Sequence, residues 1–213
     1  MRVKLCAICG ENEATTVDHL PPKGIYPKPI DNDMNMHTVP ACTDCNGGGS
    51  KEDEEFKLVI GLDTGEFRDN PSKVIDSLVG TMGHNKRLAA RIFENHRQVY
   101  AQRNGVVAER AVAVSFDSSA YIAVASRIVR GLYWRETGNA LGAEPKVTIL
   151  PASSLSISSA RAFKELMDQL NSVALNKGTF VYKGCVSNAG DSVWGMQFFK
   201  RHTVFAIAEP KKT

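Results

Sequence analysis

Two pairs of closely spaced cysteines are the residues whose type and spacing most clearly could do chemistry. They are Cys6 with Cys9 and Cys42 with Cys45, each in a Cys-x-x-Cys arrangement, and 32 residues separate the pairs. Two such pairs suit a tetrahedral Zn²⁺ site, because each tight turn supplies two thiolates. The N-terminus has no secretory-signal pattern, so we expect a cytoplasmic protein, in which zinc is favoured over disulfides. A four-cysteine site has no open position, and this zinc is therefore expected to be structural.

The segments around these cysteines carry a family resemblance. Residues 16–22 read Thr-Val-Asp-His-Leu-Pro-Pro, and residues 38–46 read Thr-Val-Pro-Ala-Cys-Thr-Asp-Cys-Asn. A Cys-x-x-Cys pair, then Asp-His followed by Pro, then Val-Pro-x-Cys-x-x-Cys-Asn is the order of the zinc-stapled HNH endonucleases, which the sequence resembles. The resemblance covers about residues 6–56, a quarter of the chain.

The resemblance implies a ββα-metal finger with a defined chemistry. His19 would be the general base, since a neutral histidine with a pKa near 7 is suited to deprotonate water. Asp18 and Asn46 would hold a catalytic Mg²⁺ or Mn²⁺, because carboxylate and amide oxygens are hard ligands. That ion would hold the scissile phosphate and neutralise the leaving oxygen. Neighbouring residues alternate across a strand, so a bulge or distortion is expected to bring Asp18 and His19 to one centre.

Two positions depart from the common HNH pattern. His37 stands five residues before the third cysteine, where the middle Asn of the family normally lies. It could steady the loop that carries the base or add a metal ligand, whereas Asn35 could replace the missing Asn only after a loop shift. Three glycines, residues 47–49, follow Asn46, and each opposes a helix by about 1 kcal/mol relative to Ala. Asn46 is therefore expected in a turn or at the start of a helix.

These residues also have plainer structural interpretations. His19 could be a structural histidine of a zinc finger, and Asp18 and Asn46 could cap turns. Asp53 could extend the metal site, but an acidic residue at the start of a helix more often complements the helix dipole, which is the interpretation we favour. Lys51 could contact phosphate or pair with an acidic residue one helical turn later.

Charge is unevenly distributed along the sequence. The net charge is +3, but residues 1–80 hold 8 Lys and Arg against 14 Asp and Glu, whereas residues 81–135 hold 9 against 3. A basic segment beside an acidic one indicates a polyanionic partner, here nucleic acid and DNA above all. Arg87 and Arg91 are among the arginines that could grip its backbone, although they could equally keep amphipathic helices soluble. No apolar run reaches the roughly 18 to 20 residues of a membrane span, so no membrane partner is expected.

A mixed set of helices and strands must position these residues. Periodicity and capping signals predict helices over residues 51–60, 70–79, 84–102, 118–137 and 159–175. Strands are expected over residues 106–116 and 147–150, and then over 179–187, 192–200 and 203–208 as an antiparallel meander. Cys185, in the first strand of the meander, is expected to be a buried thiol.

Together these elements predict an α+β protein of two parts. A zinc-stapled HNH module of residues 1–80 would be followed by residues 81–213, in which helices pack on an antiparallel sheet and position a substrate or recruit a partner. The predicted function is metal-dependent hydrolysis of phosphodiester bonds, with DNA as the expected substrate. A non-catalytic zinc-stapled nucleic-acid adaptor, a protein-interaction module and an RNA-directed nuclease are the alternatives.

Overall fold

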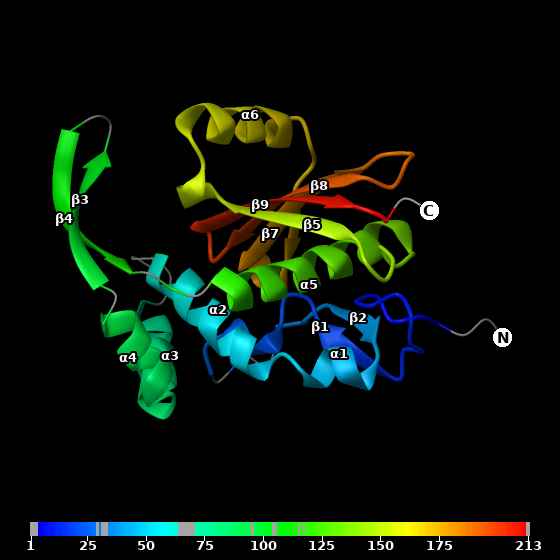
Figure 1. Ribbon diagram of the computed structural model, residues 1–213, viewed down its shortest axis with the longest axis horizontal. Coiled ribbons are helices and arrows are strands. Elements are labelled where there is room, and N and C mark those ends of the chain that lie inside the picture. The colour runs from blue at the N-terminus through cyan, green and yellow to red at the C-terminus, as the bar shows by residue number, and fades with distance from the viewer. Residues whose placement is uncertain are drawn as a thin grey trace.

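The computed structural model describes residues 4–28, 30, 34–63, 71–94, 96–103, 106–114, 116 and 118–211. An N-terminal two-stranded sheet with a four-cysteine cluster is followed by helices and then by a C-terminal five-stranded antiparallel sheet (Figure 1). The expected α+β class is therefore confirmed. Within the described residues, no helix combines the length and the apolar character needed to cross a membrane.

The N-terminal finger, residues 4–63, is an antiparallel hairpin followed by two helices. Its register is regular and pairs Asp18 with Val39. The helix expected over residues 51–60 is present and longer at both ends, and Gly48 and Gly49 separate it from the short helix before it. The elements are β1 (Thr16–His19), the 3-10 turn η1 (Lys23–Ile25), β2 (Thr38–Ala41), α1 (Thr43–Gly47) and α2 (Ser50–Asp63).

A helix pair and a long hairpin come next, and the hairpin extends away from the rest of the molecule (Figure 1). The helix expected over residues 84–102 is wrong beyond Glu94, because residues 96–103 form a strand. The apolar spacing typical of a helix does not continue beyond Leu88 and Ile92. Residues 96–103 instead pair with the valine-rich segment 106–114, whose residues strongly favour strands. The elements are α3 (Pro71–His84), α4 (Lys86–Glu94), β3 (His96–Arg103) and β4 (Val106–Val114).

The C-terminal sheet has the strand order β5-β9-β8-β7-β6 and is antiparallel, so the expected meander is confirmed. The helix expected over residues 159–175 ends at Asp168, because residues 173–175 pair with β7 as an edge strand. The elements are α5 (Ser118–Thr137), β5 (Lys146–Pro151), η2 (Ala152–Ser154), α6 (Ile157–Asp168), β6 (Val173–Leu175), η3 (Asn176–Gly178), β7 (Phe180–Val186), β8 (Ser192–Phe198) and β9 (His202–Glu209).

Helices α5 and α6 lie on opposite sides of this sheet (Figure 1). Alternate residues of β8, among them Trp194 and Met196, are fully buried in one core cluster with the buried face of α5. On the other side, the ring of Phe163 in α6 stacks on Phe205 of β9 at a centroid distance of 4.7 Å. The period-2 burial of β8 arises because the face that packs on α5 is fully buried, whereas the alternate residues on the other face are only half-buried.

The same core cluster extends into the finger. Leu20, Val39 and Phe56 of the finger belong to it together with Ile128 and Leu132 of α5. Helix α5 therefore packs on the sheet with one face and on the finger with another. The division into residues 1–80 and 81–213 stays a prediction, and the two segments share this core.

Close approach of α5 to the hairpin depends on Gly131. A Cβ atom at this position would lie 2.9 Å from Leu20 Cδ1, which is closer than real Cβ contacts. A larger residue must therefore push the helix and the hairpin apart or force Leu20 out of its place.

We expect Gly131→Val to lower the free energy of unfolding by about 1–3 kcal/mol, as overpacked core positions do. The measurement is urea denaturation of the zinc-loaded protein. Gly80→Val is the matched control, because a Cβ at Gly80 in α3 would have no neighbour within 4 Å; its effect is expected to stay below about 0.5 kcal/mol. A Gly131→Val protein as stable as the unsubstituted one would contradict this packing.

Candidate functional site

The four paired cysteines converge beside the hairpin. Their sulfur atoms all lie within 4.8 Å of one another, and Cys9 Sγ and Cys42 Sγ are 4.0 Å apart. A tetrahedral Zn²⁺ bound at about 2.3 Å would separate its sulfur ligands by about 3.8 Å. Cys6 and Cys42 are buried and Cys9 and Cys45 are half-buried. The cluster therefore fits a structural Zn²⁺, which these four cysteines could hold.

Polar groups around the cluster support thiolate ligands and tie the cluster to α5. The amide of Cys45 hydrogen-bonds to Cys42 and lowers the pKa of that thiol to about 7, which eases the proton loss that metal binding requires. The amide of Ile8 donates to Cys6 Sγ at 3.4 Å, and Arg130 Nη1 of α5 donates to the carbonyl oxygen of Ile8 at 2.7 Å. Helix α5, which lies outside the finger, thus stabilises the turn that contains Cys6 and Cys9.

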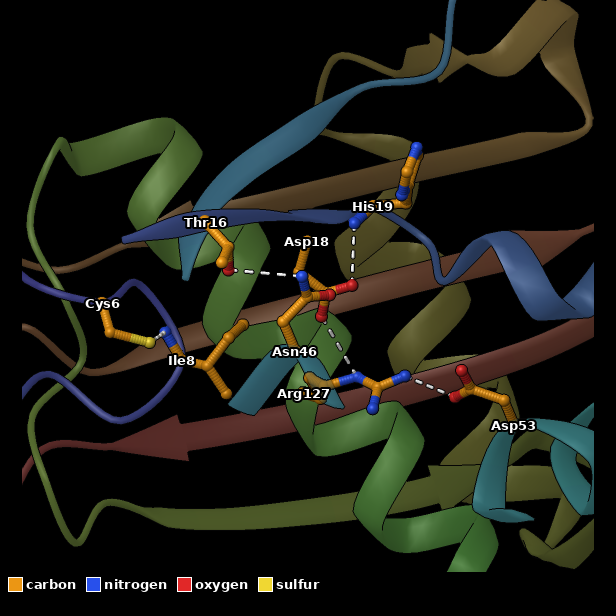
Figure 2. Close-up of polar contacts among 8 residues, drawn as sticks. All are labelled: Cys6, Ile8, Thr16, Asp18, His19, Asn46, Asp53 and Arg127. Carbon is orange, nitrogen blue, oxygen red and sulfur yellow. Dashed lines mark hydrogen bonds and ion pairs between the residues drawn. The ribbon is translucent and has the colours of Figure 1, made fainter. Parts of the chain in front are cut away.

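Asp18 is a buried carboxylate in β1, with 8% of its surface exposed. Its Oδ1 accepts a hydrogen bond from the amide of His19 at 2.8 Å, and its Oδ2 lies 3.5 Å from Nε of Arg127 (Figure 2). Burial raises the pKa of Asp18 above its ordinary value, and the charge of Arg127 opposes this rise. The carboxylate is therefore held from both sides.

Asn46 lies on the same face of the hairpin as Asp18. It is an exposed residue of the short helix α1, and its Nδ2 donates to Thr16 Oγ1 at 3.2 Å (Figure 2). Thr16 and Asp18 are two residues apart in β1, so their side chains leave the strand on one side. This side of the finger consequently gathers one carboxylate and one carboxamide.

His19 leaves the strand in the other direction, and its ring points away from the carboxylate of Asp18 (Figure 2). The expected bulge is absent, because β1 and β2 pair in regular register through Asp18 and His19, and the ordinary alternation of a strand is kept. Burial lowers the pKa of His19, the nearby charge of Lys23 lowers it further, and Asp18 acts against both. Burial and Lys23 thus favour the neutral form of the imidazole.

The loop between β1 and β2 is fastened by Asn176 of η3, which is only 3% exposed. Its Nδ2 donates to Tyr26 Oη at 2.7 Å and to the carbonyl oxygen of Leu20 at 3.4 Å, and its Oδ1 accepts from the amide of His37 at 3.3 Å. The ring of His37 contacts Arg135 Nη1 at 3.0 Å, and burial together with that charge lowers the pKa of His37. These contacts favour the loop-steadying role among the alternatives for His37.

An arginine and a second carboxylate lie beside Asp18. Arg127 of α5 forms ion pairs with both Asp18 and Asp53 of α2, whereas the sequence favoured a helix-dipole role for Asp53 (Figure 2). Burial raises the pKa of Asp53 to about 6, against the charge of Arg127. No local signal marks this pair, because 74 residues separate Arg127 from Asp53.

The basic residues predicted to contact nucleic acid lie at the surface. Arg87 of α4 and Lys51 of α2 are exposed. Arg91 is partly exposed and forms an ion pair with Glu55, so it connects α4 to α2. Their contact with a phosphate backbone stays a prediction.

Cys185 is exposed, so the expectation of a buried thiol was wrong. Strand alternation explains the difference, because Phe180 and Tyr182 of β7 point into the core and Cys185 lies on the opposite face. This exposure makes Cys185 a suitable control for the cysteine cluster.

We expect purified protein to carry one Zn²⁺ per chain and Cys42→Ala to lose it, because three thiolates hold zinc less firmly than four. Metal content by plasma mass spectrometry measures this directly. Cys185→Ala is expected to keep its zinc. Because folding and metal binding are coupled, thermal unfolding of Cys42→Ala should also begin at a lower temperature. Full zinc content in Cys42→Ala would contradict the four-cysteine site.

Comparisons with known proteins found no relative of this chain. No protein-family model, no curated protein and no solved structure matches the chain. The function of the protein must therefore be inferred from the motifs of residues 6–56 and from the arrangement of the finger. That arrangement is a four-cysteine cluster able to hold zinc, set near the N-terminus among β and α elements.

Proposed function

We propose that this protein is a metal-dependent endonuclease that hydrolyses phosphodiester bonds, with DNA as its substrate. The observation that carries the proposal is the gathering of Asp18 and Asn46 on one face of a ββα hairpin beside a closed four-cysteine cluster. His19 ends the strand that contains Asp18. These residue types, on a hairpin and the helix after it, support the proposal, whereas the direction of the His19 ring differs from what the HNH resemblance implies.

Asp18 and Asn46 are the residues that would hold a catalytic Mg²⁺ or Mn²⁺. Each carboxylate oxygen has two lone pairs, so Oδ1 of Asp18 keeps one after accepting from His19. The hydrogen bond to Thr16 uses the nitrogen of the Asn46 amide and leaves its oxygen as a possible ligand. When bound there, the ion would neutralise charge on the scissile phosphate and on the leaving oxygen.

His19 would accept a proton from the attacking water at a ring nitrogen. The lowered pKa of His19, caused mainly by burial, favours the neutral imidazole that this role requires. Because Asp18 and His19 are consecutive, their Cα atoms are about 3.8 Å apart. The two side chains leave β1 in opposite directions in this structure, so the ring of His19 would have to turn toward the Asp18 side to reach a water that attacks a phosphate held by the ion. Asn176 would keep the base in place by fastening the loop that follows it.

Exposed basic residues would supply contacts to the phosphate backbone. We assign this role to Arg87 and Lys51, which are exposed, and to Arg91, whose Nη2 also pairs with Glu55. Such contacts neutralise phosphate charge and give affinity without sequence preference.

A non-catalytic nucleic-acid adaptor is the second candidate. The ion pair of Asp18 with Arg127 favours it, because a carboxylate that is already paired has a purely structural use. An adaptor would share the cysteine cluster but would not need His19. The two candidates therefore differ in what a change of His19 does.

The decisive experiment is cleavage of supercoiled plasmid by the zinc-loaded protein with Mg²⁺, with Mn²⁺ and without added divalent ion. We expect nicking or linearisation that requires the added ion. In His19→Ala the rate should fall by about 10²–10⁴-fold, the usual contribution of a general base. His84→Ala, which changes an exposed histidine of α3, should cleave at the unsubstituted rate.

Other outcomes would redirect or reject the proposal. Equal cleavage by His19→Ala would reject His19 as the base. Cleavage of RNA but not of plasmid in a parallel assay would make the protein an RNA-directed nuclease. Salt-dependent binding to DNA without cleavage by any ion would establish the adaptor instead.

A further inference from the structure

Arg127 lies between two carboxylates that come from different parts of the finger. Its Nε is 3.5 Å from Oδ2 of Asp18 in β1, and its Nη2 pairs with Oδ1 of Asp53 in α2 (Figure 2). The three side chains are largely buried, with 13% of Arg127, 11% of Asp18 and 16% of Asp53 exposed. The guanidinium is therefore an internal link, and contact with a nucleic-acid backbone is not needed to explain it.

The space that the guanidinium occupies is provided by a glycine. A Cβ atom at Gly49 would lie 1.8 Å from Nη1 of Arg127, so no other residue fits at this position while Arg127 keeps its place. Gly49 separates α1 from α2, and this separation is where the side chain of Arg127 passes from α5. The third glycine after Asn46 is thus explained by the close approach of Arg127.

Asp18 is consequently oriented by two fixed partners. Its Oδ2 lies 3.5 Å from Nε of Arg127 in an ion pair that is not a hydrogen bond, while Oδ1 accepts a hydrogen bond from the amide of His19 on the strand itself. Arg127 is in turn restrained by Asp53 and by the packing of α5, whose neighbouring residues Ile128 and Val124 are buried in the core. The orientation of the Asp18 carboxylate is therefore set by the helix and not by the finger alone.

We propose that Arg127 is a positioning residue that fixes the orientation of the Asp18 carboxylate so that Asp18 and Asn46 can hold one divalent cation. This inference rests on the proposed function, since it concerns the ion that Asp18 and Asn46 would bind. Arg127 touches neither the substrate nor the ion in this scheme and acts through Asp18. Asp53 anchors Arg127 on the side away from the ion.

Charge alone predicts the opposite effect. A guanidinium next to a cation site repels the incoming ion, so its removal should strengthen cation binding by leaving two unpaired carboxylates. A positioning role predicts weaker binding, as when the partners that orient a metal ligand are removed. The sign of the change separates the two explanations.

The experiment is Mn²⁺ binding to the zinc-loaded full chain, followed by the electron paramagnetic resonance signal of free Mn²⁺. We expect the unsubstituted chain to bind one Mn²⁺, and Asp18→Asn to abolish this binding. Arg127→Gln should weaken it by about tenfold or more, and Arg127→Lys should recover part of the loss, since Lys keeps the charge but not the two-sided geometry. Arg161→Gln, an exposed arginine of α6 paired with Glu165, should leave it unchanged.

Zinc content and thermal unfolding of each variant show whether the finger has formed. If Arg127→Gln does not retain zinc, Asp53→Asn is the variant that tests the positioning role, because it removes the anchor and leaves Arg127 in place. We expect Asp53→Asn to weaken Mn²⁺ binding measurably, but less than tenfold. Unchanged or tighter Mn²⁺ binding in the folded variant overturns the positioning role while the metal site stands. Absence of Mn²⁺ binding in the unsubstituted chain overturns the metal site, and the positioning role with it.

Discussion

A finger that spans residues 4–63 buries too little apolar surface to hold its own shape, and two contributions from outside its sheet make up the difference. One is the four-cysteine cluster, which fits a metal that joins the start of the chain to the end of β2. The other is helix α5, which contributes apolar surface through Ile128 and Leu132 and polar contacts through Arg127 and Arg130. The path of α5 along the hairpin therefore determines the positions of Asp18 and of the cysteine turn, which its arginines contact.

This constraint gives the second half of the chain a direct part in the site. Arg127 holds Asp18, and Asn176 holds the loop that follows His19. Because α5 and η3 belong to a body with a large buried core, these contacts transmit its rigidity to the hairpin. A hydrolytic site needs its metal ligands and its base held in fixed positions, and a small finger alone provides little of that rigidity.

The sequence predicts the local features of this arrangement well. Cysteine spacing predicted the cluster, turn and capping signals predicted α5 and the meander, and the Asp18-His19 and Asn46 motifs fell on the hairpin and the helix after it. Contacts between distant segments were not predictable in this way. The amide of His37 and Asn176 are 139 residues apart, and no periodicity relates them. The prediction of a helix beyond Glu94 was wrong because it also depended on a contact that the local pattern does not show. Pairing of β3 with β4 overrode a weak helical pattern.

If Asp18 and Asn46 share one divalent cation and the four cysteines hold a separate structural zinc, the two metals must occupy different sites. Anomalous scattering from crystals of the zinc-loaded protein soaked in Mn²⁺ locates both, because the two metals have different absorption edges. We expect a zinc peak among the sulfur atoms of the four cysteines and a manganese peak in contact with Asp18 and Asn46. Manganese bound elsewhere, or none bound in crystals that leave this face open to solvent, would contradict it.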